Sequence, residues 1–402
     1  MKITLAHIQA AAKRIHGDIL STPLVYSPAL SQMFAGEIHL KMENLQKTGS
    51  FKARGAMNLI KARRDEIPAD GVVTASAGNH AQGVALAARQ ADVPATIVMP
   101  VGSSLSKQEA TRHYGGRVII EGQTISESLG VALKLAREGR MFIHPFDDPL
   151  IIAGQGTMGL EILADLPDVD RVIAPVGGGG LIAGLAVALR ALKGDVRMTG
   201  VQTAVCPSAL NAIQKGGPVE VTGATSIADG IAVRKTGRLN FEVIREMVDQ
   251  IVVVEEEQIA AAILLLMERK KIVAEGSGAV ALAALMSAAV RLQPGEKTVL
   301  LISGGNLDSP LLGRIIRKGL IKSGRIMRLN VMLADIPGAL AQLLNHIAES
   351  KANVLHIHHN RSRRDFAINM TAVELELETR GEAHTAELEQ SLRDAGYTLM
   401  VC

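Results

Sequence analysis

Short apolar runs alternate with helical patterns over two long stretches of the chain. The first stretch contains runs at residues 72–75, 95–99, 117–120 and 141–144, and the segments between them repeat apolar residues at helical spacing. Apolar runs separated in this way are typical of strands in a parallel sheet that helices cover on both faces. We therefore predict a small α/β domain over residues 49–149.

The same alternation resumes after residue 170. Four further runs predict the strands of a second parallel sheet, at 171–176, 198–201, 250–254 and 298–302. The two longest apolar runs, 259–267 and 279–290, are shorter than the roughly 18 residues that a membrane-spanning helix needs, so we interpret them as buried helices. This pattern predicts a large domain formed by residues 1–48 and 150–320, into which the small domain is inserted.

A third pattern begins near residue 329. Residues 329–402 predict a strand, a helix, two strands, a helix and a strand, the order of a ferredoxin-like unit. Pro337 stands just before the first of these helices, where the missing N–H of a proline needs no partner. The segment carries 6 Lys and Arg against 10 Asp and Glu, whereas residues 314–328 carry six basic residues and no acid. We expect residues 314–328 to form the boundary of this third domain.

The composition excludes several classes of protein. Of the 402 residues, 48% are hydrophobic and 21% are charged, as in a globular chain. Trp is absent and aromatic residues make up 2%, so base-stacking surfaces are scarce and we expect no nucleic acid as a partner. The two cysteines, Cys206 and Cys402, cannot build a disulfide framework, which indicates a reducing compartment. No signal-peptide pattern is visible at the first residues, so we expect a cytoplasmic location and no membrane association.

A lysine among small residues opens the predicted small domain. Residues 48–55 read T-G-S-F-K-A-R-G, which places Lys52 close to the start of a predicted helix. The positive end of the helix disfavours the ammonium form, and a neutral amine could then form a Schiff base. Taken alone the signal is weak, because most lysines are solvated surface charges.

Three loops that directly follow predicted strands are candidate ligand sites. The four glycines at 177–180 let backbone N–H groups converge on a phosphate at the start of a helix, although a tight turn without a ligand stays open. Residues 76–83 could hold a carboxylate, but Ser and Asn are also ordinary helix caps. Residues 303–306 follow the last strand of the second sheet. Because ligands of open α/β sheets lie outside the carboxyl ends of the strands, we expect these loops to meet.

Four histidines near the C-terminus resemble a metal cluster at first sight. They are His346, His356, His358 and His359. No cysteine accompanies them, and the arginines between residues 361 and 364 oppose a bound cation. We expect surface histidines and no metal.

Four motifs taken together resemble those of the pyridoxal-phosphate enzymes of the tryptophan synthase β-like family (fold type II). They are T-G-S-F-K at 48–52, S-A-G-N-H at 76–80, G-G-G-G-L at 177–181 and S-G-G-N at 303–306. Cysteine synthases of that family typically have S-V-K, and threonine synthases have S-F-K-D-R. The S-F-K-A-R of this chain is more similar to the threonine and serine dehydratases.

The resemblance implies pyridoxal 5'-phosphate as the cofactor and a role for each motif. Lys52 would be the catalytic Schiff-base lysine, Asn79 would lie beside the phenolic oxygen of the cofactor, and Ser303 would face its pyridine nitrogen. A hydroxyl at that position leaves the nitrogen largely unprotonated. The cofactor phosphate would lie against Gly177, Gly178, Gly179, Gly180 and Leu181. The substrate carboxylate would lie against Ser76, Ala77, Gly78, Asn79 and His80.

The resemblance also implies an activity, namely β-elimination from L-threonine to give 2-oxobutanoate and ammonia, with L-serine as a second substrate. Serine racemases of the family carry a serine at the position of Ala77, so racemisation should be poor. Acidic metal ligands of some members are replaced here by Gln202 and Ser208, so we expect no divalent metal. A serine dehydratase and a non-catalytic amino-acid sensor stay open as alternatives.

The C-terminal segment resembles a single ACT-type regulatory domain. Its first strand-to-helix turn would contain Asp335, Pro337, Gly338 and Ala339, and the resemblance implies that a small amino acid such as isoleucine binds there as an effector. We expect a homo-oligomer, either a dimer or a tetramer. A domain that only holds the oligomer together is the alternative, and a nucleic-acid patch at 314–328 lacks a docking motif.

Overall fold

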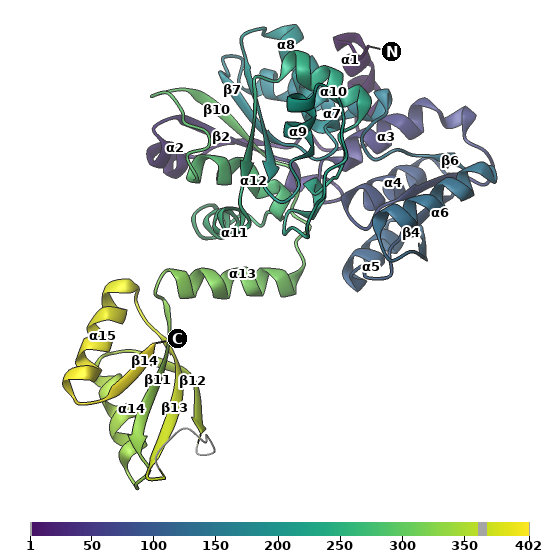
Figure 1. Cartoon of the computed structure of the whole chain (residues 1–402). Helices are drawn as coiled ribbons and strands as arrows, with labels where there is room; N and C mark the ends of the chain where they lie inside the picture. The colour runs from purple at the N-terminus through teal and green to yellow at the C-terminus, as the bar shows by residue number, and fades with distance from the viewer. Residues whose placement is uncertain (1, 361–367, 402) are drawn as a thin grey trace. The chain divides into compact units, whose positions relative to one another are not determined.

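The computed structural model describes residues 2–360 and 368–401 of the chain. The chain divides into two compact units, Met1–Asp308 and Ser309–Cys402 (Figure 1). Over the described residues, the first unit holds a six-stranded and a four-stranded sheet, and the second holds a four-stranded sheet. In this part of the chain no helix is long and apolar enough to cross a membrane. The domain boundaries at residues 49 and 149 stay a prediction.

The smaller sheet of the first unit contains the four strands predicted between residues 72 and 144. All its neighbours pair in parallel, in the order β5-β4-β3-β6. Every residue of β3 and β4 is buried, as continuous apolar runs require. The strands are β3 (Val72–Ala75), β4 (Ala95–Met99), β5 (Arg117–Ile120) and β6 (Met141–Phe142). The helices in this part of the sequence are α3 (Lys52–Ala62), α4 (Asn79–Gln90), α5 (Leu105–His113) and α6 (Ile125–Arg137), with the short helix η2 (Arg64–Glu66).

The larger sheet contains the other four predicted strands and two that the sequence pattern missed. Its order is β1-β2-β10-β7-β8-β9, and β1 alone pairs antiparallel to its neighbour among these strands. β2 was missed because it reads E-I-H-L-K-M, with a fully buried lysine in place of an apolar residue. The strands are β1 (Leu24–Tyr26), β2 (Glu37–Met42), β7 (Arg171–Pro175), β8 (Arg197–Thr203), β9 (Gln250–Val254) and β10 (Lys297–Ile302).

The remaining helices of the first unit include the two that were predicted from long apolar runs. These two are α11 (Glu256–Leu265) and α12 (Gly276–Met286). Small residues let neighbouring helices approach closely: a Cβ atom on Gly184 of α8 would lie 2.4 Å from the carbonyl oxygen of Ile152 in α7. The other helices are α1 (Leu5–Ile15), α2 (Pro28–Phe34), α7 (Pro149–Asp165), α8 (Gly180–Leu192), α9 (Ser208–Lys215) and α10 (Arg238–Met247), with the short turns η1 (Glu43–Leu45), η3 (Asp229–Ile231) and η4 (Leu266–Lys270).

The second unit has the predicted β-α-β-β-α-β order after one additional helix. Its antiparallel sheet has the order β12-β13-β11-β14. Its apolar core combines one face of this sheet with residues of α14 and α15. The elements are α13 (Ser309–Lys322), β11 (Ile326–Ala334), α14 (Ala339–Glu349), β12 (Asn353–Asn360), β13 (Met370–Glu378), α15 (Glu382–Asp394) and β14 (Thr398–Val401).

The basic segment 314–328 is not the boundary that we predicted. It forms most of α13 and the start of β11, and the two compact units meet between Asp308 and Ser309. Arg317 of α13 and Arg328 of β11 both form ion pairs with Glu376 of β13, at 2.5 and 3.0 Å. The run of positive charge is therefore partly neutralised within its own unit, which a count of charges along the sequence cannot reveal.

Candidate active site

One cavity of about 900 Å³ in the first unit brings all four motifs together. It lies at the carboxyl ends of β3, β7 and β10, where the three loops leave the two sheets. This is the edge at which ligands of open α/β sheets bind. The predicted residues that line the cavity are Lys52, Ser76, Ala77, Gly78, Asn79, His80, Gly177, Gly178, Gly179, Gly180, Leu181 and Ser303.

Lys52 is the first residue of α3, and its side chain is half-buried in the cavity wall. Its Nζ donates a hydrogen bond to the carbonyl oxygen of Pro145 at 3.0 Å. Burial lowers the pKa of Lys52 to about 8, and the carboxyl group of Glu275 partly opposes this shift. A much larger fraction of this amine is therefore neutral near neutral pH than of an ordinary lysine.

The segment that carries Lys52 pairs with the segment that carries Ser303. Ser50 and Gly304 form an antiparallel bridge, and the N–H of Phe51 donates to the carbonyl oxygen of Ser303 at 3.1 Å. Gly49 has a φ of +69°, and a Cβ atom there would lie 2.4 Å from Oδ1 of Asn306. The hydroxyl of Ser303 is buried and has no hydrogen-bond partner among the described residues. The two segments thus place an amine and an unpaired hydroxyl on the same cavity.

The four glycines form a closely packed turn between β7 and α8. Gly179 directly precedes α8 and has a φ of +96°, and Nδ2 of Asn240 donates to the carbonyl oxygen of Gly178 at 2.8 Å. A Cβ atom on Gly178 would lie 2.3 Å from the ring of Phe146, and one on Gly180 would lie 2.7 Å from the carbonyl oxygen of Phe146. No larger residue fits these two positions, so the backbone N–H groups at the start of α8 stay accessible to an anion.

Asn79 belongs to a chain of side-chain hydrogen bonds that the sequence did not predict. Its Nδ2 donates to Oε1 of Glu275 at 2.6 Å, and its Oδ1 accepts from Nδ2 of Asn306 at 2.7 Å. Nδ2 of Asn306 also donates to the carbonyl oxygen of Thr48 at 2.8 Å. These bonds fix the amide of Asn79 at the cavity wall through two residues that lie about 200 or more positions later in the sequence.

Glu275 is the main site residue that the sequence analysis missed. It is buried at the start of α12 and lines the cavity. Burial, together with the negative charge of Asp229, raises the pKa of Glu275 to about 7, and the hydrogen bond from Asn79 opposes this shift. The available signal was an isolated acid directly before an entirely buried helix, a position at which a charge is unexpected without a partner.

His80 is held neutral in the wall of the cavity. Burial lowers the pKa of His80 to about 3, and the neighbouring Lys52 contributes in the same direction. Its Nε2 lies 3.3 Å from the carbonyl oxygen of Ile143, which favours the tautomer that donates from Nε2. His80 is therefore a poor proton acceptor at neutral pH, and its imidazole is suited to orienting neighbouring groups.

Gln202, one of the two residues that we expect in place of metal ligands, caps the helix α9. Oε1 of Gln202 accepts hydrogen bonds from the N–H groups of Ala209 and Leu210 at 2.9 and 3.0 Å, at the start of α9. Among the described residues, no group of three or more His, Cys, Asp or Glu is placed to hold a metal ion. Independence from a divalent metal stays a prediction.

A second cavity, of about 400 Å³, lies in the C-terminal unit. It surrounds the turn between β11 and α14, and its lining includes Asp335, Pro337, Gly338 and Ala339. Half-buried His359 also lines it, whereas His356 and His358 are exposed and His346 is half-buried against Ser391. The arginines between residues 361 and 364 lie outside the described residues.

Comparison with known proteins identifies the family of this chain. The model of a family described as "Pyridoxal-phosphate dependent enzyme" matches residues 15–304. The chain belongs to this family of pyridoxal-phosphate-dependent enzymes. The match spans the first three motifs and ends inside the fourth, the S-G-G-N loop.

Similar members of the pyridoxal-phosphate family include ammonia-lyases and a racemase. The L-threonine ammonia-lyase of Thermotoga maritima is 49% identical over 401 residues, which cover 99% of each chain. The structure of the processed form of threonine deaminase isoform 2 from Solanum lycopersicum has a TM-score of 0.73 and 36% identity, and it covers 78% of this chain and 86% of its own. The structure of maize serine racemase has a TM-score of 0.75 and 34% identity, and it covers 80% of this chain and 99% of its own.

The residues of the cavity fit the cofactor of the family. The glycine turn lines the cavity at the start of α8, where backbone N–H groups can bind a phosphate. Lys52 offers an amine of lowered pKa, and Ser303 offers a buried hydroxyl without a partner among the described residues. Buried polar groups are normally paired, so a bound molecule accounts for this unpaired hydroxyl.

Proposed function

We propose that this enzyme is an L-threonine ammonia-lyase that produces 2-oxobutanoate and ammonia and also accepts L-serine. The observation that carries the proposal is the amine of Lys52, which has a lowered pKa and shares one cavity with the glycine turn and the Ser76–His80 loop. The likeness to a threonine ammonia-lyase over the full chain supports threonine as the substrate.

Each motif has a chemical task in this proposal. The bound cofactor withdraws electrons from the Cα atom of the substrate. Lys52 removes the proton from Cα, because burial keeps a neutral amine available. The substrate carboxylate binds the Ser76–His80 loop, where the first N–H groups of α4 have no partner within the helix. Asn79, held by Glu275 and Asn306, hydrogen-bonds the phenolic oxygen of the cofactor.

Direct assay of both amino acids tests the proposed reaction. Purified enzyme supplied with L-threonine should release equal amounts of ammonia and 2-oxobutanoate, with a higher kcat/KM than for L-serine. A clear preference for serine would make the chain a serine dehydratase. Binding of both amino acids without release of ammonia would indicate a non-catalytic sensor.

We also propose that the C-terminal unit is an ACT-type regulatory domain. Its β-α-β-β-α-β order and the cavity around Asp335, Pro337, Gly338 and Ala339 support a site for a small amino acid. Isoleucine is the proposed inhibitor, because 2-oxobutanoate is a precursor of its carbon skeleton. Coupling of this kind typically changes an affinity by about 5- to 150-fold.

A chain that ends after Ser323 separates regulation from docking. Regulation predicts that the truncated enzyme is active but no longer responds to isoleucine. We propose that the full-length and the truncated chains then both form a cytoplasmic homo-oligomer. If the full-length enzyme responds to no amino acid and truncation breaks the oligomer, the unit is a docking domain.

A further inference from the structure

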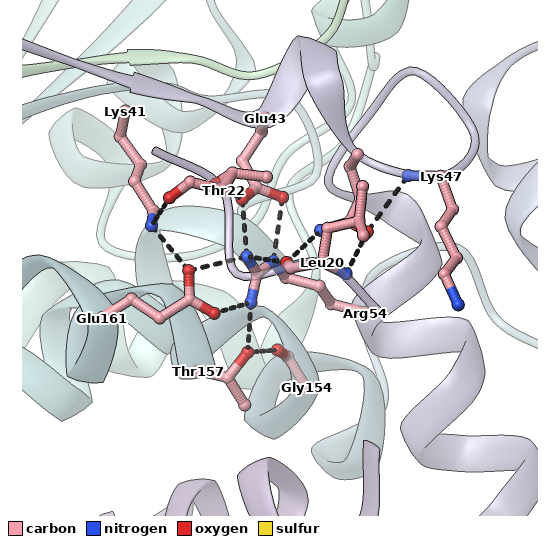
Figure 2. Close-up of polar contacts among 10 residues, drawn as sticks. Leu20, Thr22, Lys41, Glu43, Lys47, Arg54, Gly154, Thr157 and Glu161 are labelled. Carbon is pink, nitrogen blue, oxygen red and sulfur yellow. Dashed lines mark hydrogen bonds and ion pairs between the residues drawn. The ribbon is translucent and has the colours of Figure 1, made fainter. Parts of the chain in front are cut away.

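Arg54, two residues after Lys52, lies in a cluster of charges in which Arg54, Lys41 and Glu43 are fully buried and Glu161 is partly buried (Figure 2). Its Nε and Nη2 donate to the two carboxylate oxygens of Glu43 at 2.9 and 2.7 Å. Its Nη1 and Nη2 donate to the two oxygens of Glu161 at 2.6 and 2.9 Å. Glu43 begins η1 and Glu161 belongs to α7. The guanidinium group therefore joins α3 to two other elements through two paired contacts.

The cluster is balanced in charge and well supplied with hydrogen bonds. Nζ of Lys41 donates to Glu161 and to the carbonyl oxygen of Thr22, each at 2.6 Å. The Thr22 hydroxyl donates to Glu43 at 2.5 Å. Burial raises the pKa of Glu43, but the charge and hydrogen bonds of Arg54 outweigh burial and keep the carboxyl ionised. Two cations thus face two anions, and removing one member leaves an unbalanced buried charge.

The geometry of α3 links this cluster to the catalytic amine. Successive residues of an α-helix are about 100° apart around its axis, so Lys52 and Arg54 point to nearly opposite sides. Lys52 lines the cavity, while Arg54 is held among the carboxylates. Any rotation of the first turn that moves Arg54 also moves Lys52.

Glycine contacts bring the neighbouring helices close to this turn. A Cβ atom on Gly55 would lie 2.9 Å from the carbonyl oxygen of Ile151 in α7, and one on Gly83 of α4 would lie 3.1 Å from that of Lys52. Such contacts set a distance between backbones. The planar guanidinium is directional, since each of its N–H groups must meet a carboxylate oxygen.

We propose that Arg54 is a positioning residue, which through Glu43 and Glu161 fixes the rotation of α3 and thereby the location of the Lys52 amine. The proposal rests on the role of Lys52 toward the cofactor, and it does not depend on threonine as the substrate. Lysine in place of Arg54 keeps the charge but loses the paired contacts.

The test compares Arg54→Lys with Arg171→Lys. Arg171 is also buried and bonds a buried carboxylate, with its Nε 2.6 Å from Oε1 of Glu296. It stands at the amino end of β7, whereas the cavity lies at the carboxyl end. Both variants should lower Tm. Two readouts follow: the rate at which cofactor-free enzyme captures added pyridoxal phosphate on Lys52, mapped by borohydride reduction and mass spectrometry, and kcat of the holoenzyme.

A misplacement of about 1 Å can reduce a rate by about 100-fold. Arg54→Lys should therefore slow capture and lower kcat by about 10- to 100-fold, with a smaller change in KM, while Arg171→Lys changes both rates less than about twofold. Equal losses in the two variants, or normal capture in Arg54→Lys, would overturn the proposal. If Arg54→Lys does not fold, Glu161→Gln replaces it with the same expected direction. Wild-type capture without threonine turnover would refute the proposed function alone.

Discussion

Two strand-to-helix turns in this chain have nearly the same backbone and different surroundings. Gly179 directly precedes α8 and has a φ of +96°, and Gly338 directly precedes α14 and has a φ of +89°. A Cβ atom on Gly179 would lie 2.9 Å from Cβ of Asn240, and its neighbours in the turn are packed as closely. At Gly338, no atom of the described residues lies within 4 Å of such a Cβ.

The difference separates a glycine packed against neighbouring side chains from a glycine without such contacts. In the first turn, Phe146 and Asn240 restrain the glycines. In the second, a side chain at Gly338 would meet no atom of the described residues, and backbone hydrogen bonds hold the turn, such as the one from the N–H of Asp335 to the carbonyl oxygen of Asn369. The first arrangement suits a cofactor that is bound permanently, and the second suits an effector that binds and leaves.

The largest expected effect comes from Lys52→Ala. This substitution should remove the covalent attachment of the cofactor and lower kcat by at least about 10²- to 10⁴-fold, the usual contribution of a positioned acid–base group. Calorimetric binding of isoleucine to the C-terminal unit should stay unchanged. Attachment of the pyridoxyl group to another lysine after borohydride reduction would show that Lys52 is not the attachment site.

Gly178→Ala and Gly338→Ala compare the two turns directly. Gly178→Ala should lower stability by about 1–3 kcal/mol through overpacking against Phe146 and should strongly weaken cofactor binding. Gly338→Ala should lower stability by about 1–2 kcal/mol through its left-handed φ, with normal turnover and a weaker response to isoleucine. Thermal unfolding and cofactor titration of both variants check this, and equal cofactor affinities would contradict the contrast.

The pH dependence of cofactor capture sharpens the comparison at Lys52. Because burial lowers the pKa of Lys52 to about 8, capture by cofactor-free enzyme should speed up as the pH rises through about 8, below the range of an ordinary lysine. The carboxyl of Glu275 raises this pKa, so Glu275→Gln should move the midpoint to lower pH. The rate at which free lysine captures pyridoxal phosphate over the same pH range is the control for titration of the cofactor itself. A midpoint that stays in place would exclude this coupling.

The smallest expected signal is the formation of D-serine from L-serine. Ala77 lines the cavity, and its methyl group cannot donate a proton to a substrate bound there. Chiral analysis of enzyme incubated with L-serine should detect racemisation at a negligible rate relative to elimination. Comparable rates would mean that another residue supplies the proton.

The motifs could be predicted from the sequence because each one is local. Four glycines after a strand, or a lysine at the start of a helix, can be recognised from the neighbouring residues alone. The four strands of the smaller sheet and four of the six strands of the larger sheet followed from continuous apolar runs. Glu275 and Arg54 could not be assigned roles in this way, because their partners come from distant elements. β2 was missed for the same reason, since Glu161 of α7 is what allows Lys41 to be buried.

The two paired segments beside Lys52 are far apart in the sequence. Ser50 precedes all strands of the smaller sheet, whereas its bridge partner Gly304 directly follows the last strand of the larger one. Closing so long a loop is entropically unfavourable until other contacts in the sheets have formed. We therefore expect a newly made chain to acquire its cofactor after both sheets have assembled. The visible absorbance of the bound cofactor during refolding should then report the end of folding of residues 1–308, independently of the C-terminal unit.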